Sequence, residues 1–279
     1  MRQIYPAQGP ELQVVQKAAP GPLPTAVTEL ARLYGGSAGS SQDRSPPSLR
    51  ANMVASADGA AELDGRSGGL SGPADRMVFT VLRSLADLIL VGAGTARTER
   101  YRPAQTAGLW QQLRRPGAPP PAIAVVSASL SLDPDGQLFT GTAAGAQTIV
   151  VTTAAAPADR KAAIGRHARI VEAGEHHVDV AAAVRALRDL GYARILCEGG
   201  PTLLGQLADA GLLDELCVTT SPVLAAGHAG RIVREPADSG PESGTTPPGA
   251  ASAAAPAGLS LAHLLADENF LFSRYLSER

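Results

Sequence analysis

RILCEGGPTLL, residues 194–204, is the stretch that decides the fold. The apolar run Ile195–Cys197 is typical of a strand, and an acid, two glycines and a proline follow it before a run of helix formers. Glycine permits a sharp turn and close approach to a ligand, and Pro201 suits the first position of a helix, where no N–H is needed. The free N–H groups and positive dipole end of such a helix attract phosphate. The stretch therefore predicts a strand–loop–helix unit with Glu198 at the carboxyl end of the strand, where ligands bind in open α/β sheets. A tight turn without a ligand is the alternative.

The sequence on both sides of this unit alternates between strand and helix patterns. We expect strands at 49–56, 87–91, 122–127, 148–152, 168–172 and 216–224, and helices at 73–85, 157–166 and from 180 to just before Gly191. The runs 259–265 and 269–276 are typical of a terminal antiparallel pair. This order predicts an α/β fold with a mixed, mostly parallel sheet and helices on both faces.

The domain organisation follows from composition. Residues 1–48 are polar and proline-rich, with one helical pattern near 28–34, and we expect a partly flexible arm. Residues 49–279 are expected to form a single domain, in which the Ser/Pro/Gly/Ala-rich segment 235–258 is a mobile loop.

Bulk composition excludes several classes of function. A net charge of −2 over 279 residues gives no attraction to nucleic acid or anionic membrane. The longest apolar runs fall short of the roughly 18–20 residues that span a bilayer. Cys197 and Cys217 lie in strand-like runs, which favours free buried thiols in a reducing cytoplasm. The five histidines show no zinc spacing, and the His-x-Glu and Pro-Cys-x-x-Cys pattern of zinc deaminases is absent, so we expect no metal.

Four loops follow expected strands: Ser56–Asp58, Gly92–Thr95, Ser127–Ser129 and Glu198–Thr202. Two of them are glycine turns entering helices, and their backbone amides suit a dinucleotide diphosphate and a further phosphate. An ordinary Rossmann fingerprint is not satisfied, because Arg97 stands where a third small residue is needed and no acid follows about 20 residues on. The pattern thus favours a different cofactor-binding α/β fold.

Three runs together resemble a known family: RANMVASADG (50–59), LRSLADLILVGAGT (82–95) and CEGGPTLL (197–204). In order and spacing they resemble the pyrimidine reductase family of riboflavin biosynthesis, whose fold is similar to dihydrofolate reductase. The resemblance covers about residues 49–276 and is greatest to the stand-alone actinobacterial branch, which lacks a zinc deaminase domain. It implies a homodimer that uses NADPH to reduce 5-amino-6-(5-phosphoribosylamino)uracil, or a close relative, with hydride delivered to ribose C1′ to give the ribitylamino product.

The resemblance also implies roles for individual residues. Those expected to bind the cofactor are Ala55, Ser56, Gly94, Thr95, Ser127, Ser129, Gly199, Gly200, Pro201, Thr202, Leu203 and Leu204. Those expected to contact the substrate are Asn52, Ser67, Arg83 and Glu198, with Arg83 as a phosphate clamp. The proton that accompanies hydride transfer could be handled by a carboxyl group, and the candidates are Asp58, Glu99 and Glu198.

Two positions depart from the family pattern. Glu99 stands where many members have aspartate, and Ala128 stands between Ser127 and Ser129, so no arginine lies there and selectivity for the cofactor 2′-phosphate must come from elsewhere. Two other functions remain open: an NADPH reductase of another heterocycle such as dihydrofolate or a dihydropterin, and a regulatory protein that binds the cofactor without turnover.

Overall fold

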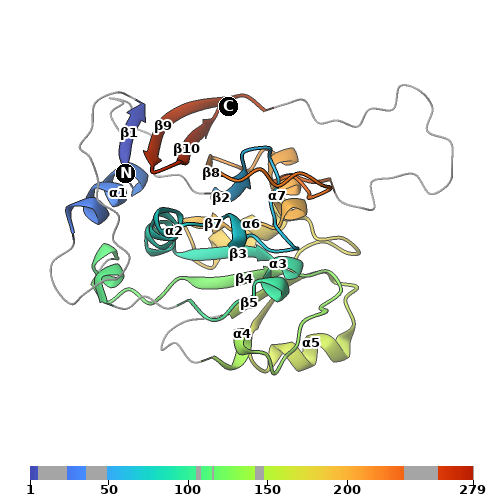
Figure 1. Ribbon diagram of the computed structural model, residues 1–279. Coiled ribbons are helices and arrows are strands. Elements are labelled where there is room, and N and C mark those ends of the chain that lie inside the picture. The colour runs from blue at the N-terminus through green and yellow to red at the C-terminus, as the bar shows by residue number, and fades with distance from the viewer. Residues whose placement is uncertain are drawn as a thin grey trace.

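A ten-stranded mixed sheet forms the centre of the protein (Figure 1). The computed structural model describes residues 1–5, 24–35, 49–104, 108–114, 116–141, 148–235 and 257–278. The strands are β1 (Arg2–Tyr5), β2 (Leu49–Ser56), β3 (Leu88–Gly92), β4 (Ala122–Val126), β5 (Thr148–Thr152), β6 (Arg169–Glu172), β7 (Ile195–Cys197), β8 (Glu215–Ser221), β9 (Leu259–Asp267) and β10 (Phe270–Ser277). The helices are α1 (Thr25–Gly35), α2 (Pro73–Leu85), α3 (Ala93–Thr98), α4 (Gln137–Thr140), α5 (Ala158–Gly165), α6 (Val180–Asp189) and α7 (Pro201–Asp209), with 3₁₀ turns η1 (Gly68–Leu70) and η2 (Gly108–Leu113).

The strand order is β1-β9-β10-β8-β2-β7-β3-β4-β5-β6. The seven strands from β8 to β6 run parallel, and β10, β9 and β1 join them in antiparallel pairing. Helices cover both faces of the parallel part, which explains why β3 and β4 are nearly uninterrupted apolar runs. The expected mixed, mostly parallel sheet and its terminal antiparallel pair are therefore confirmed.

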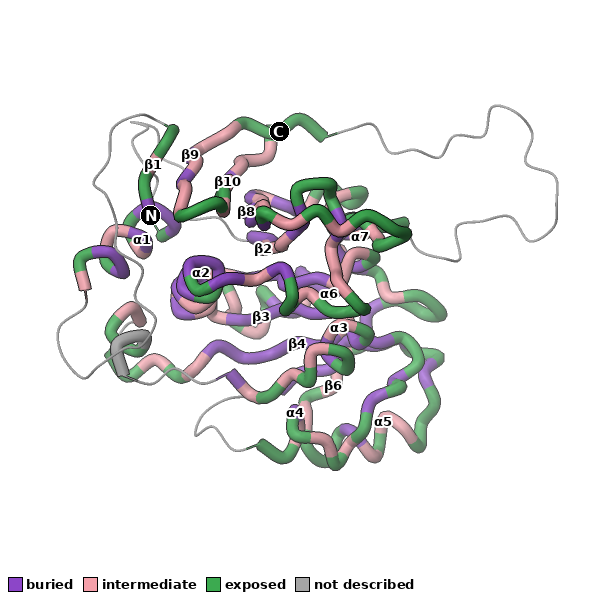
Figure 2. Tube along the Cα trace, in the orientation of Figure 1, coloured by how far each residue is buried: buried purple, intermediate pink, exposed green. Residues whose placement is uncertain are grey.

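Successive residues of β3 show how the two faces are filled. Leu88 and Leu90 pack with α6 and α7, whereas Ile89 and Val91 pack on the other face with α3 and α5. Helices α1 and α2 cover that second face near β7 and β8. Figure 2 shows buried positions concentrated along the central strands, as this alternation requires. The sheet thus separates two apolar layers and leaves its carboxyl edge to the loops.

The predicted elements between residues 49 and 221 all form, within one or two residues of the expected ends except for β8, which stops at Ser221, three residues before the expected end at 224. Helix α1 contains the predicted helical pattern at 28–34, and β1, which we did not predict, pairs with β9. The rest of the predicted arm, and nearly all of the predicted mobile loop 235–258, lie outside the described residues. The division into an arm and one domain stays a prediction.

A buried charge cluster holds α1 against the sheet. Glu215 on β8 pairs with Arg50 on β2 and with Arg274 on β10, the latter at 2.8 Å from Nη2 to Oε2. The two guanidinium groups also donate to the last carbonyls of α1, from Arg50 to Tyr34 O and from Arg274 to Leu33 O, each at 2.5 Å. Cations are favoured at this end of a helix. Burial opposes the charge of Glu215, but the two arginines outweigh it and lower its pKa.

Candidate active site

The four loops predicted to carry chemistry meet at one edge of the sheet. They follow β2, β7, β3 and β4, which are neighbours in that order and run parallel. Parallel strands end at a common edge, so the loops after them lie side by side. The topology therefore gathers the predicted cofactor and substrate residues at the carboxyl edge.

The two glycine turns touch each other through backbone atoms. Gly92 N donates to Gly199 O at 2.8 Å. A Cβ on Gly92 would lie 3.3 Å from Gly200 N, and a Cβ on Gly200 would lie 2.6 Å from Thr95 Oγ1. Gly199 has φ +87°, a left-handed conformation that favours glycine. Glycine is thus required here by close approach and by backbone conformation.

This pair of turns fits a phosphate-bearing ligand. Helix α7 begins at Pro201, and no side chain caps its amino end. A Cβ on Gly94 would meet nothing within 4 Å, so open space lies beside the first turn of α3. Unsatisfied helix N–H groups next to such space form an anion seat. The glycine cradle therefore fits the diphosphate of a nicotinamide cofactor.

The side chains of Leu203 and Leu204, in the first turn of α7, lie in the core. Leu203 and Leu204 are buried against the sheet, and Leu204 N already donates to Gly200 O at 3.0 Å. Leu204 was expected to bind the cofactor, but its N–H and its side chain are both committed inside the protein. The backbone N–H groups of Thr202 and Leu203 are the ones that could face a ligand.

Glu198 is the centre of a buried polar cluster beside the cradle. Arg83 on α2 binds it through two parallel hydrogen bonds, Nε to Oε1 at 2.7 Å and Nη2 to Oε2 at 2.6 Å. The Tyr101 hydroxyl donates to Oε2 at 2.6 Å. The guanidinium also lies over the rings of Phe79 at 4.3 Å and Tyr101 at 5.4 Å. Arg83, expected as a phosphate clamp, is thus committed to a carboxylate of the protein.

The charges of this cluster shift two pKa values. Burial opposes the charge of Arg83, but the neighbouring Glu198 carboxylate outweighs it and raises the arginine pKa. Burial, reinforced by the same carboxylate, raises the pKa of Tyr101 well above its ordinary value. Tyr101 therefore keeps its proton and donates it to Glu198, while Arg83 neutralises the carboxylate.

Asn52 lies next to this cluster on β2. Ala51 pairs with Cys197 across β2 and β7, so Asn52 and Glu198 occupy the next register position on the same face. Among the residues that the structure describes, the half-buried Asn52 amide has no hydrogen-bond partner. An amide so placed can donate to and accept from a heterocycle bound over Glu198.

Ser67 and Glu99, predicted separately for substrate binding and proton handling, are brought together. Ser67 N and Ser67 Oγ both donate to Glu99 Oε1, each at 2.9 Å. Both residues are half-buried, and they join the long loop after β2 to the end of α3. Glu99 is therefore held in place by the loop that carries Ser67.

Asp58 is placed differently from its predicted catalytic role. Its carboxylate accepts from Ser56 Oγ at 2.5 Å and from the backbone N–H groups of Ala225 and Ala226 at 3.0 and 2.8 Å. The Ser56 hydrogen bond is the largest of the causes that lower its pKa to about 2. Asp58 is thus an exposed, ionised anchor between two loops, which is unsuited to donating a proton at neutral pH.

Ser127 and Ser129 differ although both follow β4. Ser127 is buried and its N–H donates to Val151 O at 2.9 Å, whereas Ser129 is exposed and its Oγ lies 3.0 Å from Ser131 Oγ. The exposed hydroxyl is the one that a ligand could reach. Ala55 and Ser56, expected on the nicotinamide side, are buried at the end of β2, whereas Asn52, Met53 and Val54 before them are half-buried.

Sequence reasoning did not assign Tyr101 to the Glu198 cluster. Its position depends on the end of α3, where Arg100 takes a left-handed φ of +52° and Tyr101 N returns to Ala96 O at 2.9 Å. A positive φ at a residue other than glycine or asparagine leaves no signal in the sequence. The glycine-rich motif alone could not have shown where the chain turns next.

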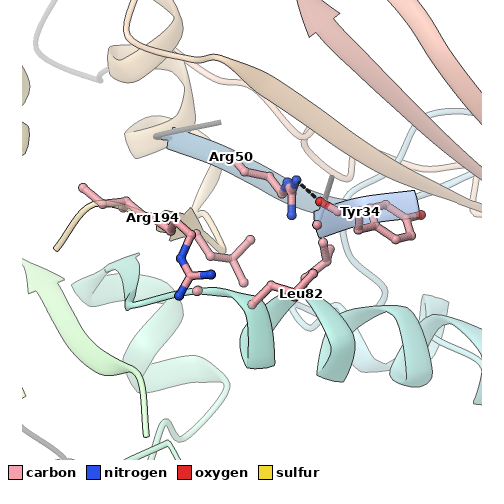
Figure 3. Close-up of a pocket in the computed structure, with 9 residues that line it drawn as sticks. Tyr34, Arg50, Leu82 and Arg194 are labelled. Atoms are coloured by element: carbon pink, nitrogen blue, oxygen red, sulfur yellow. Dashed lines mark hydrogen bonds between the residues drawn. The ribbon is translucent and has the colours of Figure 1, made fainter. Parts of the chain in front are cut away.

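A cavity of about 40 Å³ lies at the opposite edge of the sheet, at the start of β2 and β7 (Figure 3). Tyr34, Arg50, Leu82 and Arg194 are among the residues that line it, and Figure 3 shows the dashed hydrogen bond from Arg50 to Tyr34. Arg194 is itself paired with Asp87 at 2.6 Å. The cavity is therefore far smaller than a nucleotide needs, and it lies away from the glycine loops.

Comparison with known families decides the wider relationship. The family model described as the RibD C-terminal domain matches residues 47–241, which include both glycine turns and Glu198. The chain belongs to the RibD C-terminal domain family. The predicted resemblance to riboflavin-pathway pyrimidine reductases is thereby confirmed.

Relatives of this RibD-type chain agree in name and in fold. It is 27% identical over 185 residues to a 2,5-diamino-6-ribosylamino-4(3H)-pyrimidinone 5′-phosphate reductase from Archaeoglobus fulgidus, covering 65% of this chain and 83% of the relative. The enzyme of the same name from Methanothermobacter thermautotrophicus is also 27% identical, over 67% of this chain and 83% of its own length. A solved pyrimidine reductase-like protein from Corynebacterium diphtheriae has a TM-score of 0.69 at 27% identity, over 84% of this chain and 93% of that one. These findings confirm the predicted fold of the RibD-type reductase domain.

The described residues contain neither a membrane-spanning helix nor a metal-binding group of side chains. No helix among them is long and apolar enough to cross a membrane. Across the same residues, no group of three or more histidine, cysteine or acidic side chains could hold a metal ion. Cys197 and Cys217 are both free and buried, and burial raises the pKa of Cys197 to about 12.

Proposed function

We propose that this oxidoreductase of riboflavin biosynthesis uses NADPH to reduce a phosphorylated ribosylaminopyrimidine at ribose C1′. The relatives named above are reductases of such a compound, which supports the reaction class. The observation that carries the proposal is the adjacency of the uncapped glycine cradle and the Glu198 cluster at one sheet edge. That adjacency would bring a cofactor and a heterocycle together, which is most of what hydride transfer requires of a protein.

The cofactor would lie across the two glycine turns. The N–H groups at the start of α7 would hold its diphosphate, and Gly94 leaves room beside α3. Gly200 and Thr95 would lie beneath the diphosphate, since their close approach fixes the glycine turn before α7. NADPH, once bound, supplies the hydride. The residues of the two glycine turns would hold the cofactor in the orientation that hydride transfer needs.

The substrate would lie over β2 and β7, against Asn52 and the Glu198 cluster. Arg83 compensates the charge of Glu198, and Tyr101 fixes the carboxylate, so the cluster offers a rigid polar wall. The Asn52 amide would bind the edge of the pyrimidine ring. Opening of the ribose breaks the bond from C1′ to the ring oxygen and requires one proton for that oxygen, while hydride addition to C1′ leaves the nitrogen with the N–H that it already carried. Glu99 and Glu198 remain the carboxyl groups proposed to handle it.

The acceptor has two candidates that differ at ring position 2. The predicted acceptor, 5-amino-6-(5-phosphoribosylamino)uracil, carries an oxygen there, whereas the compound in the names of the two archaeal relatives carries an amino group. The names of those relatives favour the amino compound as a second candidate. A site whose polar groups pair with an oxygen at ring position 2 binds the amino compound poorly, and the reverse also holds, because the wrong compound leaves buried polar groups of the site unpaired.

Measured turnover tests the proposal. NADPH oxidation would be followed by the loss of its near-ultraviolet absorbance with each of the two acceptors in turn. Dihydrofolate and a dihydropterin would be tested in the same way as alternative substrates. Consumption with either ribosylaminopyrimidine supports the proposal, and the faster one names the substrate. Oxidation with a pterin alone would favour the other reductase function, and binding of NADPH with no oxidation would favour a regulatory protein.

A cytoplasmic homodimer completes the proposal. The two buried free cysteines suit a reducing compartment, and the dimer is implied by the resemblance to the reductase family. Sedimentation velocity of the purified chain at several concentrations would give its mass, and a single monomeric species throughout would contradict the dimer.

A further inference from the structure

Arg97 lies at the end of α3 and reaches across to the loop that follows β4. Its Nη1 donates to Ser131 O at 2.8 Å, while the residue stays exposed. Within the described ranges, no carboxylate lies at ion-pair distance from this guanidinium. An arginine held by one neutral carbonyl keeps its full charge and its remaining N–H donors for another partner.

The loop under Arg97 is held rigid and carries hydroxyl groups. Arg160 on α5 donates through Nη2 to Leu130 O at 2.8 Å and to Leu132 O at 2.6 Å, which fixes the loop from the opposite side. On the same loop, Ser129 Oγ lies 3.0 Å from Ser131 Oγ. Two exposed hydroxyls beside a free guanidinium are suited to an anion with several acceptor oxygens.

The position of this loop fits one end of the proposed cofactor. The strands run in the order β2-β7-β3-β4, and the diphosphate cradle lies over β7 and β3. If the nicotinamide half extends to the Glu198 cluster and β2, the adenosine half must extend towards β4. The Ser129–Ser131 loop is therefore on the side where the adenosine ribose would lie.

We infer that Arg97 binds the 2′-phosphate of the cofactor, with the Ser129 and Ser131 hydroxyls beside it, and so makes the chain selective for NADPH over NADH. This inference rests on the proposed function and deepens it. It supplies, from α3, the cation that is missing between Ser127 and Ser129, where the chain has Ala128. A phosphate dianion gains a charge-assisted hydrogen bond from the guanidinium that an NADH ribose hydroxyl cannot match.

Calorimetry with 2′,5′-ADP and 5′-AMP tests Arg97 without turnover. In Arg97→Ala we expect the Kd for 2′,5′-ADP to rise about tenfold, the effect of losing one charge-assisted contact, while binding of 5′-AMP is unchanged. Arg97→Gln can keep the hydrogen bond to Ser131 O without the charge. It should therefore show the same loss if the charge binds the phosphate, and no loss if the alanine variant acts only by disturbing the loop. Arg185→Ala, an exposed arginine on α6, is the matched control and should bind both ligands as the original chain does.

The outcomes separate the inference from the proposal on which it rests. Equal losses for both ligands, or no loss in either Arg97 variant, would overturn the role of Arg97. An unaltered chain that binds NADPH and NADH equally well would overturn the selectivity and leave the reductase assignment standing. A folded chain that binds neither coenzyme would instead overturn the proposed function.

Discussion

Replacing His263 with phenylalanine should make the protein more resistant to acid. His263 lies on β9 with no exposed surface, and neither ring nitrogen has a hydrogen-bond partner among the described residues. Its ring meets the edge of Tyr34 at 4.8 Å between centroids. Burial, reinforced by the nearby Arg274 charge, lowers the His263 pKa to about 3. The folded protein therefore keeps this imidazole neutral through most of the acid range.

The size of the effect follows from the two pKa values. In the unfolded chain a histidine has a pKa of about 6.5, so between pH 6.5 and about 3 the unfolded state binds one proton more than the folded state. The free energy of unfolding then falls by about 1.4 kcal/mol for each pH unit below 6.5. At pH 4.5 the loss from His263 amounts to about 3 kcal/mol. Phenylalanine cannot titrate, and its ring can keep the contact with Tyr34.

Urea unfolding at pH 7.5 and 4.5, followed by circular dichroism, measures this difference. Carboxyl groups titrate in both proteins, so the relevant quantity is the gap between the original chain and His263→Phe, which should widen by about 3 kcal/mol on acidification. The control is His167→Gln, at an exposed histidine after α5. The difference in unfolding free energy between the original chain and this variant should not change between the two pH values. Parallel pH curves for the original chain and His263→Phe would refute the reasoning.

Three further changes test other parts of the structure. Glu215→Gln leaves two buried arginines without a counter-charge and should cost about 3–5 kcal/mol of unfolding free energy, measured by urea melts; a loss below about 1 kcal/mol would show that the cluster is not held by charge. Gly200→Asp brings a carboxylate to the phosphate cradle and a Cβ against Thr95, so the Kd for NADPH should rise by about 100-fold or more in calorimetry, and unchanged affinity would remove the loop from the cofactor site. Asp58→Asn should speed hydrogen exchange at the 225–226 amides. The lowered Asp58 pKa implies that this anchor is complete above the ordinary aspartate pKa and is lost as the pH falls towards 2. Protection of these two amides relative to their intrinsic exchange rates should fall in the same range, and protection that stays constant would argue against the anchor.

The central strands could be predicted because their burial on both faces leaves a clear pattern. Runs such as 88–91 contain only apolar residues, and glycine marks the turns that follow β3 and β7, at Gly92 and Gly199. Strand β1 has no such pattern, since its four residues are mostly exposed and its pairing is set by β9 from the other end of the chain. Topology then gave the location of the site, because loops after parallel strands share an edge.

The partners within the site could not be predicted in the same way. Glu198 and Arg83 are 115 residues apart, and whether that arginine faces a ligand or a carboxylate depends on side-chain packing. Asp58 looked catalytic because it follows a core strand, but its partners include backbone amides 167 and 168 residues further on. Contacts of this kind use N–H groups that every residue type carries, so they leave no trace in the sequence.

The contacts that hold α1 and β1 affect the order in which the chain can fold during its synthesis. Arg274 lies 241 positions after Leu33, yet it donates to Leu33 O, and β9 provides the neighbour of β1. During synthesis these early segments emerge from the ribosome long before the strands that receive them. Strand β1 and the Leu33 carbonyl of α1 therefore lack these partners until β9 and β10 have been made, whereas α1 can already pack on α2.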